Sequence, residues 1–160
     1  MHRFPFGEPL LTLRQKPLAD AEVFVLGVYA SAVHARWLNP DGSTRVTALA
    51  VASEPYIFWR GEGQDEIIGS IDIPAEAGRL APPGPAMNGP SGVALDELYL
   101  KPLGLTRQNA WLCDLLPQSR MNPGQAQAVR ARYNPVAQAL DLPAATIPPV
   151  PNRFATETRV

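Results

Sequence analysis

Apolar residues follow one another without a polar interruption from Val23 to Leu26, and Gly27 ends the run. A continuous apolar run that is bounded by a glycine is typical of a strand covered on both faces, as in a parallel sheet. In open α/β sheets, ligands bind at the carboxyl ends of such strands. We therefore expect a ligand site over Gly27–His34.

The next segment carries a signal for chain reversal. The sequence Asn39-Pro40-Asp41-Gly42 is typical of a tight turn between two strands. It predicts antiparallel arms over Ala32–Leu38 and Arg45–Ala52, and the second arm, which has no clearly polar face, is expected to be buried or paired on both sides. Aromatic and β-branched residues predict a further strand at Tyr56–Trp59, with a return arm at Ile67–Ile73.

The second half of the chain predicts two helices and another strand. Ser91 is a good N-cap, and an apolar stripe at helical spacing follows it: Leu95, Leu98, Tyr99 and Pro102. Residues Ala110–Leu116 have the pattern of a buried strand, which carries Asp114. Asn122 is expected to cap a second helix that runs to about Tyr133. The order of these elements predicts a mixed α/β layer fold.

Composition limits the class of protein. The length of 160 residues predicts one domain, and a net charge of −1 argues against a dedicated nucleic-acid binder. The single cysteine, Cys113, excludes an internal disulfide and favours a reducing, cytoplasmic location. No apolar run approaches the length of a membrane span, so we expect no membrane partner.

Four short segments stand in a recognisable order: GPSG at residues 89–92, LD at 95–96, PLGL at 102–105 and NAWLCDLLP at 109–117. They resemble the central part of the uracil-DNA glycosylase superfamily, especially its bacterial thermostable branch, and VLGVYAS at residues 25–31 is similar to the family's first motif. The resemblance implies a three-layer fold with a central, mostly parallel sheet, to which this chain adds an antiparallel hairpin insertion. Such a domain would continue to more strands, so we expect a fragment, or a sheet that a partner chain completes.

The family flips a damaged base out of DNA into a pocket and cleaves its N-glycosidic bond in base-excision repair. The resemblance places that pocket, without a cofactor, at Gly27, Tyr29, Ser31 and Asp114, with Arg120 nearby. Val28 and His34, in the segment expected to bind the ligand, complete a set of seven residues. Asp114 and Tyr29 are the expected catalytic residues, and the other five are expected to bind substrate. Two distant histidines and one cysteine give no metal-ligand spacing.

The chain departs from the family at the residues that matter most for catalysis. Where the family has a polar or acidic residue that orients the hydrolytic water, this chain has Val28 and Tyr29. Asp114 replaces the asparagine that recognises uracil, and an ionised aspartate only accepts hydrogen bonds. The family's late histidine-containing loop has no counterpart, because His2 and His34 both lie upstream.

Two functions therefore stay open. The chain is either a glycosylase that acts on a nucleobase in DNA or a non-catalytic member of the fold that binds a nucleotide or a protein partner. The missing acid, the missing loop and the near-neutral charge favour the second.

Each of the residues expected at the site could also have a purely structural role. Asp114 can cap a turn, Tyr29 can cover the sheet end, His34 can be half-buried without function, and Arg120 can be solvated.

Overall fold

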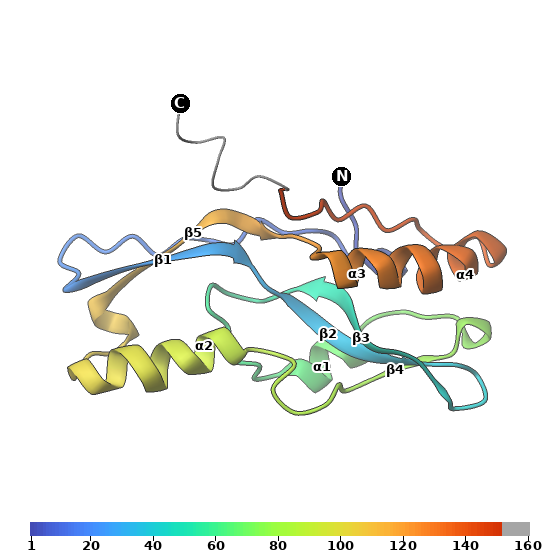
Figure 1. Ribbon diagram of the computed structural model, residues 1–160, viewed down its shortest axis with the longest axis horizontal. Coiled ribbons are helices and arrows are strands. Elements are labelled where there is room, and N and C mark those ends of the chain that lie inside the picture. Colours follow the sequence, from blue (N-terminus) through green and yellow to red (C-terminus); the bar gives the residue numbers. More distant parts are fainter. Residues whose placement is uncertain (152–160) are drawn as a thin grey trace.

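The structure is a computed structural model that describes residues 1–151, and its five strands form two small sheets (Figure 1). Strand β1 (Val23–Ala30) pairs in parallel with β5 (Ala110–Ser119). Strand β2 (Ala32–Leu38) pairs antiparallel with β3 (Thr44–Ser53) on one side and with β4 (Arg79–Ala81) on the other. The mixture of helices and strands confirms the α/β class, although the described strands include only one parallel pair.

One residue, Ser31, separates β1 from β2, so a single extended path runs through both sheets. The strand predicted from the apolar run is therefore longer than expected, since it passes Gly27 and ends at Ala30. His34 lies inside β2, the first arm of the predicted hairpin. The site expected over Gly27–His34 coincides with the junction of the two sheets.

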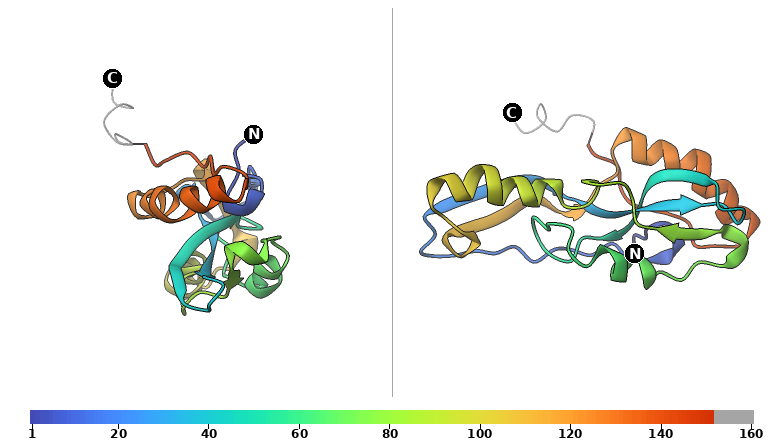
Figure 2. Two further views of the ribbon diagram at one scale, coloured as in Figure 1. Left: turned by 90° about the vertical axis from the view of Figure 1, so that its right-hand side faces the viewer. Right: turned by 90° about the horizontal axis from the view of Figure 1, so that it is seen from below.

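The helices lie on either side of this strand path (Figure 2). Their bounds are α1 Gln64–Gly69, α2 Pro90–Ala94 with helical turns Leu95–Leu100 and Lys101–Leu103, and α3 Pro123–Ala128 with a helical turn Val129–Tyr133 and α4 Asn134–Ala139. Single 3₁₀ turns occupy Pro5–Gly7, Ala75–Ala77 and Arg107–Asn109. Within residues 1–151, none of these helices has the length and apolar character that a transmembrane segment needs.

The predicted hairpin is confirmed as β2 and β3. Its turn is held by Asp41, whose carboxylate accepts the backbone N–H of Ser43 at 2.9 Å. The strands predicted at Tyr56–Trp59 and Ile67–Ile73 are wrong, because the first segment is a series of turns, and the second begins with the end of α1 and continues without regular structure. Phe58 adopts a positive φ of 51°, which bends the chain away from an extended path.

The sheet of β1 and β5 is covered on one face only. The covered face packs against the helical stretch 90–103 in a cluster that includes Leu95, Leu100 and Leu112. The opposite face exposes apolar side chains: Phe24, Leu26, Val28, Trp111 and Leu115. The prediction that this strand is covered on both faces is therefore wrong for the described residues.

Strand β1 also has no second strand partner within residues 1–151, so a segment or chain that completes the sheet stays a prediction. The predicted helical stripe is right for Leu95, which is buried, but wrong for Leu98 and Tyr99, which are exposed. The stretch from Leu95 to Leu100 is wound as a π-helix, and Leu100 takes the buried position instead.

The largest core lies around β2 and β3 and contains the fully buried rings of Trp37, Trp59 and Tyr133. The second half of β3 is buried, as predicted. Asn122 caps α3 as predicted, since its side chain accepts the backbone N–H of Gln125 at 2.8 Å. This packing fixes the start of α3 and strand β2, which begins at the sheet junction.

Candidate functional site

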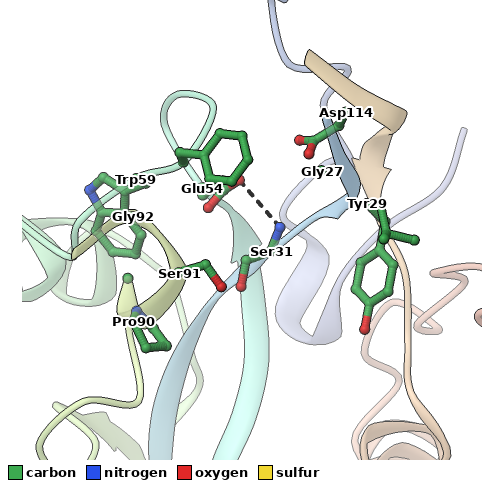
Figure 3. Close-up of a pocket in the computed structure, with 12 residues that line it drawn as sticks. Gly27, Tyr29, Ser31, Glu54, Trp59, Pro90, Ser91, Gly92 and Asp114 are labelled. Carbon is green, nitrogen blue, oxygen red and sulfur yellow. Dashed lines mark hydrogen bonds between the residues drawn. The ribbon is translucent and has the colours of Figure 1, made fainter. Parts of the chain in front are cut away.

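A cavity of about 310 Å³ opens where the two sheets meet (Figure 3). It is lined by β1 and β5 on one side and by the segment after β3 and the start of α2 on the other: Gly27, Val28, Tyr29, Ser31, Glu54, Phe58, Trp59, Gly89, Pro90, Ser91, Gly92 and Asp114. Its volume falls at the lower end of the range for small-molecule pockets. Five of the seven residues predicted for the site are among these.

Gly27 makes room for the carboxylate of Asp114. The two residues face each other across the parallel pair of β1 and β5. A Cβ atom on Gly27 would lie 2.1 Å from Oδ1 of Asp114 and 3.1 Å from Cζ of Phe58. Only a residue without a side chain therefore allows the carboxylate and the phenyl ring to approach β1 together.

Glu54 is the second carboxylate of the cavity, and sequence analysis did not identify it. It follows directly after β3 and is 3% exposed. One of its carboxylate oxygens accepts the backbone N–H of Ser31 at 3.2 Å, as Figure 3 shows. The hairpin brings Glu54 to this place, because Ala32 pairs with Ser53 and the next residue is therefore opposite Ser31.

Both carboxyl groups hold their protons unusually well. Burial raises the pKa of Glu54 from its ordinary 4.5 to about 7; the negative charge of Asp114 adds to this effect, while the Ser31 N–H and Arg107 oppose it. Burial raises the pKa of Asp114 from 3.8 to about 6. Paired acids whose pKa values are moved toward neutrality are typical of sites that transfer protons.

Phe58 contributes an aromatic ring to the cavity, and Arg107 holds its backbone in place. Nη2 of Arg107 donates to the carbonyl oxygens of Phe58 at 2.6 Å and of Gly92 at 3.2 Å. Nε of Arg107 donates to Asp96 at 2.8 Å. A side chain on Gly92 would collide with the Phe58 carbonyl, at 2.2 Å from its Cβ. The start of α2 and the Phe58 turn therefore form one rigid wall.

A second cavity, of about 430 Å³, adjoins the first. The two share Tyr29, Ser31 and Pro90, and the second cavity is also lined by His34 and Arg120. The seven predicted residues are thus brought to one place but divided between two compartments. Burial lowers the pKa of His34, with the Asn88 side chain opposing this effect, so the ring is neutral at pH 7.

Within residues 1–151, no group of three or more histidine, cysteine, aspartate or glutamate side chains is arranged to hold a metal ion. Comparison with protein-family models, with curated proteins and with solved structures gives no match to this chain. The chemistry of the two cavities is therefore what indicates a function.

Proposed function

We propose that the chain binds a nucleobase in the first cavity and hydrolyses its N-glycosidic bond, as a DNA glycosylase does. The observation that carries this proposal is the pair Glu54 and Asp114 in one small cavity with the ring of Phe58. An aromatic ring favours a flat heterocycle by stacking, and two carboxyl groups can exchange protons with it and with water. The resemblance to the uracil-DNA glycosylase superfamily supports the same substrate class.

The position of Asp114 suits recognition of the base. Its carboxylate lies against Gly27 at the same end of the cavity as Phe58, so a base stacked on Phe58 presents an edge to it. With a pKa of about 6, Asp114 is mostly ionised at pH 7 and accepts hydrogen bonds from two donors. Below pH 6 it carries a proton and offers one donor and one acceptor, which complements the edge of uracil.

Glu54 is the group that we assign to the hydrolytic water. Water adds to C1′ of the sugar, and the bond from C1′ to the base nitrogen breaks. The base leaves with the electron pair of that bond and takes a proton from solvent, while the ionised carboxylate of Glu54 accepts a proton from the water. The hydrogen bond from the Ser31 N–H orients this carboxylate next to a residue that lines both cavities.

Glu54 also bears on the alternative of a non-catalytic binding protein. That alternative was favoured by the missing late loop, by the near-neutral charge, and by Val28 and Tyr29, which leave the sequence motif without a water-activating group. Glu54 supplies a carboxylate in the same cavity from a different element, the end of β3. The arrangement favours an enzyme, and the expected catalytic role of Tyr29 moves to Glu54 in this proposal.

Strand cleavage at abasic sites tests the proposal. Labelled single strands and duplexes carry one uracil, hypoxanthine or xanthine and are incubated with the protein, then treated with alkali. We expect cleavage of at least one substrate, and a rate reduced by about 100-fold or more in Glu54→Gln, as for the loss of a general base. The matched control is Glu97→Gln, because Glu97 is an exposed carboxylate that pairs with Lys101 away from the cavity. Absence of cleavage by the wild type, or full activity in Glu54→Gln, contradicts the proposal.

A further inference from the structure

The second cavity contains a cation without a counter-ion. Arg120 lines it and is half-buried, and its Nε is buried and has no hydrogen-bond partner within residues 1–151. None of the residues that line this cavity is an aspartate or a glutamate. A guanidinium that is partly removed from water without a partner is costly, and its planar set of donors matches the oxygens of a phosphate.

From these observations we propose that the second cavity binds the phosphate group of a nucleotide whose base occupies the first cavity, with Arg120 as the cationic ligand. This inference rests on the proposed function and adds the part of the substrate that lies beyond the base and the sugar. The cavities meet at Tyr29 and Ser31, next to Glu54, where the sugar of such a nucleotide would lie.

The surroundings of Arg120 are held in place by hydrogen bonds. The hydroxyl of Ser119 donates to the Ser31 carbonyl oxygen at 2.6 Å, which ties the end of β5 to the junction between the cavities. The backbone N–H of Met121 donates to the Pro148 carbonyl oxygen at 2.9 Å. The residue between them, Arg120, is therefore placed by fixed backbone on both sides.

His34 adds a second unsatisfied donor to the wall of the cavity. Nε2 of its neutral ring accepts a hydrogen bond from the amide of Gln125 at 2.7 Å, so Nδ1 carries the hydrogen. This Nδ1 is buried and forms no well-directed hydrogen bond within residues 1–151, although the Asn88 side chain and the Ala32 backbone lie near enough to oppose the effect of burial on the pKa of the ring. Gln125 also belongs to the cap of the helical stretch that begins at Pro123, whose positive end favours an anion. The wall thus combines donors and one positive charge, and offers no negative charge.

Inorganic phosphate is the first probe, because it needs no base and no catalysis. Its affinity is measured by calorimetry for the wild type, for Arg120→Gln and for the control Arg130→Gln. Arg130 is exposed and donates to Gln127 on the surface of the helix. We expect a loss of about tenfold or more in Arg120→Gln, as for a charge-assisted hydrogen bond, and no change in the control. Equal affinity in the wild type and Arg120→Gln overturns the inference.

The second probe distinguishes a nucleotide in a strand from a free nucleotide. Binding of a short single-stranded oligonucleotide and of a nucleoside monophosphate is measured as a function of salt concentration. Loss of one phosphate contact in Arg120→Gln should lower the slope for the oligonucleotide by about 0.7. A slope that stays unchanged, with no loss of monophosphate affinity, overturns the inference.

The two proposals fail separately. Phosphate binding that depends on Arg120, in a protein that cleaves no substrate, supports the anion site and removes the proposed reaction. Cleavage that depends on Glu54, with phosphate affinity unaffected by Arg120→Gln, supports the reaction and removes the anion site.

Discussion

Replacing Glu54 with Gln removes a carboxylate from a place where burial disfavours its charge. In the folded protein the carboxyl keeps its proton up to a pKa of about 7, whereas an ordinary glutamate loses it near 4.5. Between these values the folded state binds one proton more than the unfolded state. The free energy of unfolding therefore falls as the pH rises through this window, and it falls no further above about pH 7.

The size of this effect follows from the two pKa values. The pKa of Glu54 is about 7 in the folded protein and 4.5 ordinarily. Relative to acidic pH, this difference lowers the free energy of unfolding by about 3 kcal/mol at pH 8.5 and by less than about 1 kcal/mol at pH 5. Glutamine has nearly the same shape, keeps an oxygen that can accept the Ser31 N–H, and carries no charge. We therefore expect Glu54→Gln to be about 2–3 kcal/mol more stable than the wild type at pH 8.5.

Urea unfolding of both proteins at pH 5 and pH 8.5 measures this difference, with Glu97→Gln as an exposed control. The stabilisation should appear at pH 8.5 and shrink to below about 1 kcal/mol at pH 5. Equal or lower stability of Glu54→Gln at pH 8.5 would refute the argument, because it would mean that the carboxylate is not penalised by burial. A gain in stability together with a loss of activity is typical of a site strained for function.

Three further predictions follow from the geometry. Gly27→Ala should displace Asp114 and Phe58, so base release should fall by about tenfold or more, whereas Gly42→Ala in the hairpin turn should leave the rate unchanged. Leu112→Ala should lower the free energy of unfolding by about 2–5 kcal/mol and Leu26→Ala by less than about 1 kcal/mol, since Leu112 is 0% and Leu26 is 55% exposed; equal losses would contradict the packing of this sheet. For a base that ionised Asp114 recognises, release that needs ionised Glu54 should rise with pH to about 7 and then level off, and a rate that falls between pH 6 and 8 would exclude Glu54 as the base.

The sequence predicted the hairpin because it depends on a local signal, and the residues expected at the site line a cavity of the structure. The turn at Asn39–Gly42 is short and specific, and it fixed both arms of the hairpin within about a residue. Gly27 marks the site because a strand residue without a side chain allows a close approach, here that of Asp114. Asp114 was expected at the site because it lies on the predicted strand, and Arg120 because it directly follows that strand, β5.

Glu54 was missed because its role depends on pairing between distant residues. In the sequence it stands between Ser53 and Pro55, where a charged residue is ordinary at the end of a strand. A signal was nevertheless present, since a hairpin that turns at Asp41–Gly42 returns the chain beside Ser31 at residue 54. The register of the predicted arms, extended by one residue, would have placed a carboxylate next to the expected site.

The sequence also did not predict that one face of the β1–β5 sheet is open. A continuous apolar run does not reveal how many of its faces are covered, because coverage depends on which other elements pack there. Phe24 and Trp111 pack edge to face with ring centroids 5.6 Å apart, yet they stay exposed on this face. Their pattern alone is the same as that of a strand buried on both faces.

The central claim is that Glu54 activates water for release of a nucleobase. Single-turnover incubation at pH 8, with the free base quantified by chromatography, tests it in the wild type and in Glu54→Gln. We expect stoichiometric release of the base by the wild type, and in the variant a rate that is reduced by about 100-fold or more. Equal rates in the two proteins, or no free base from any substrate of the panel, would contradict it.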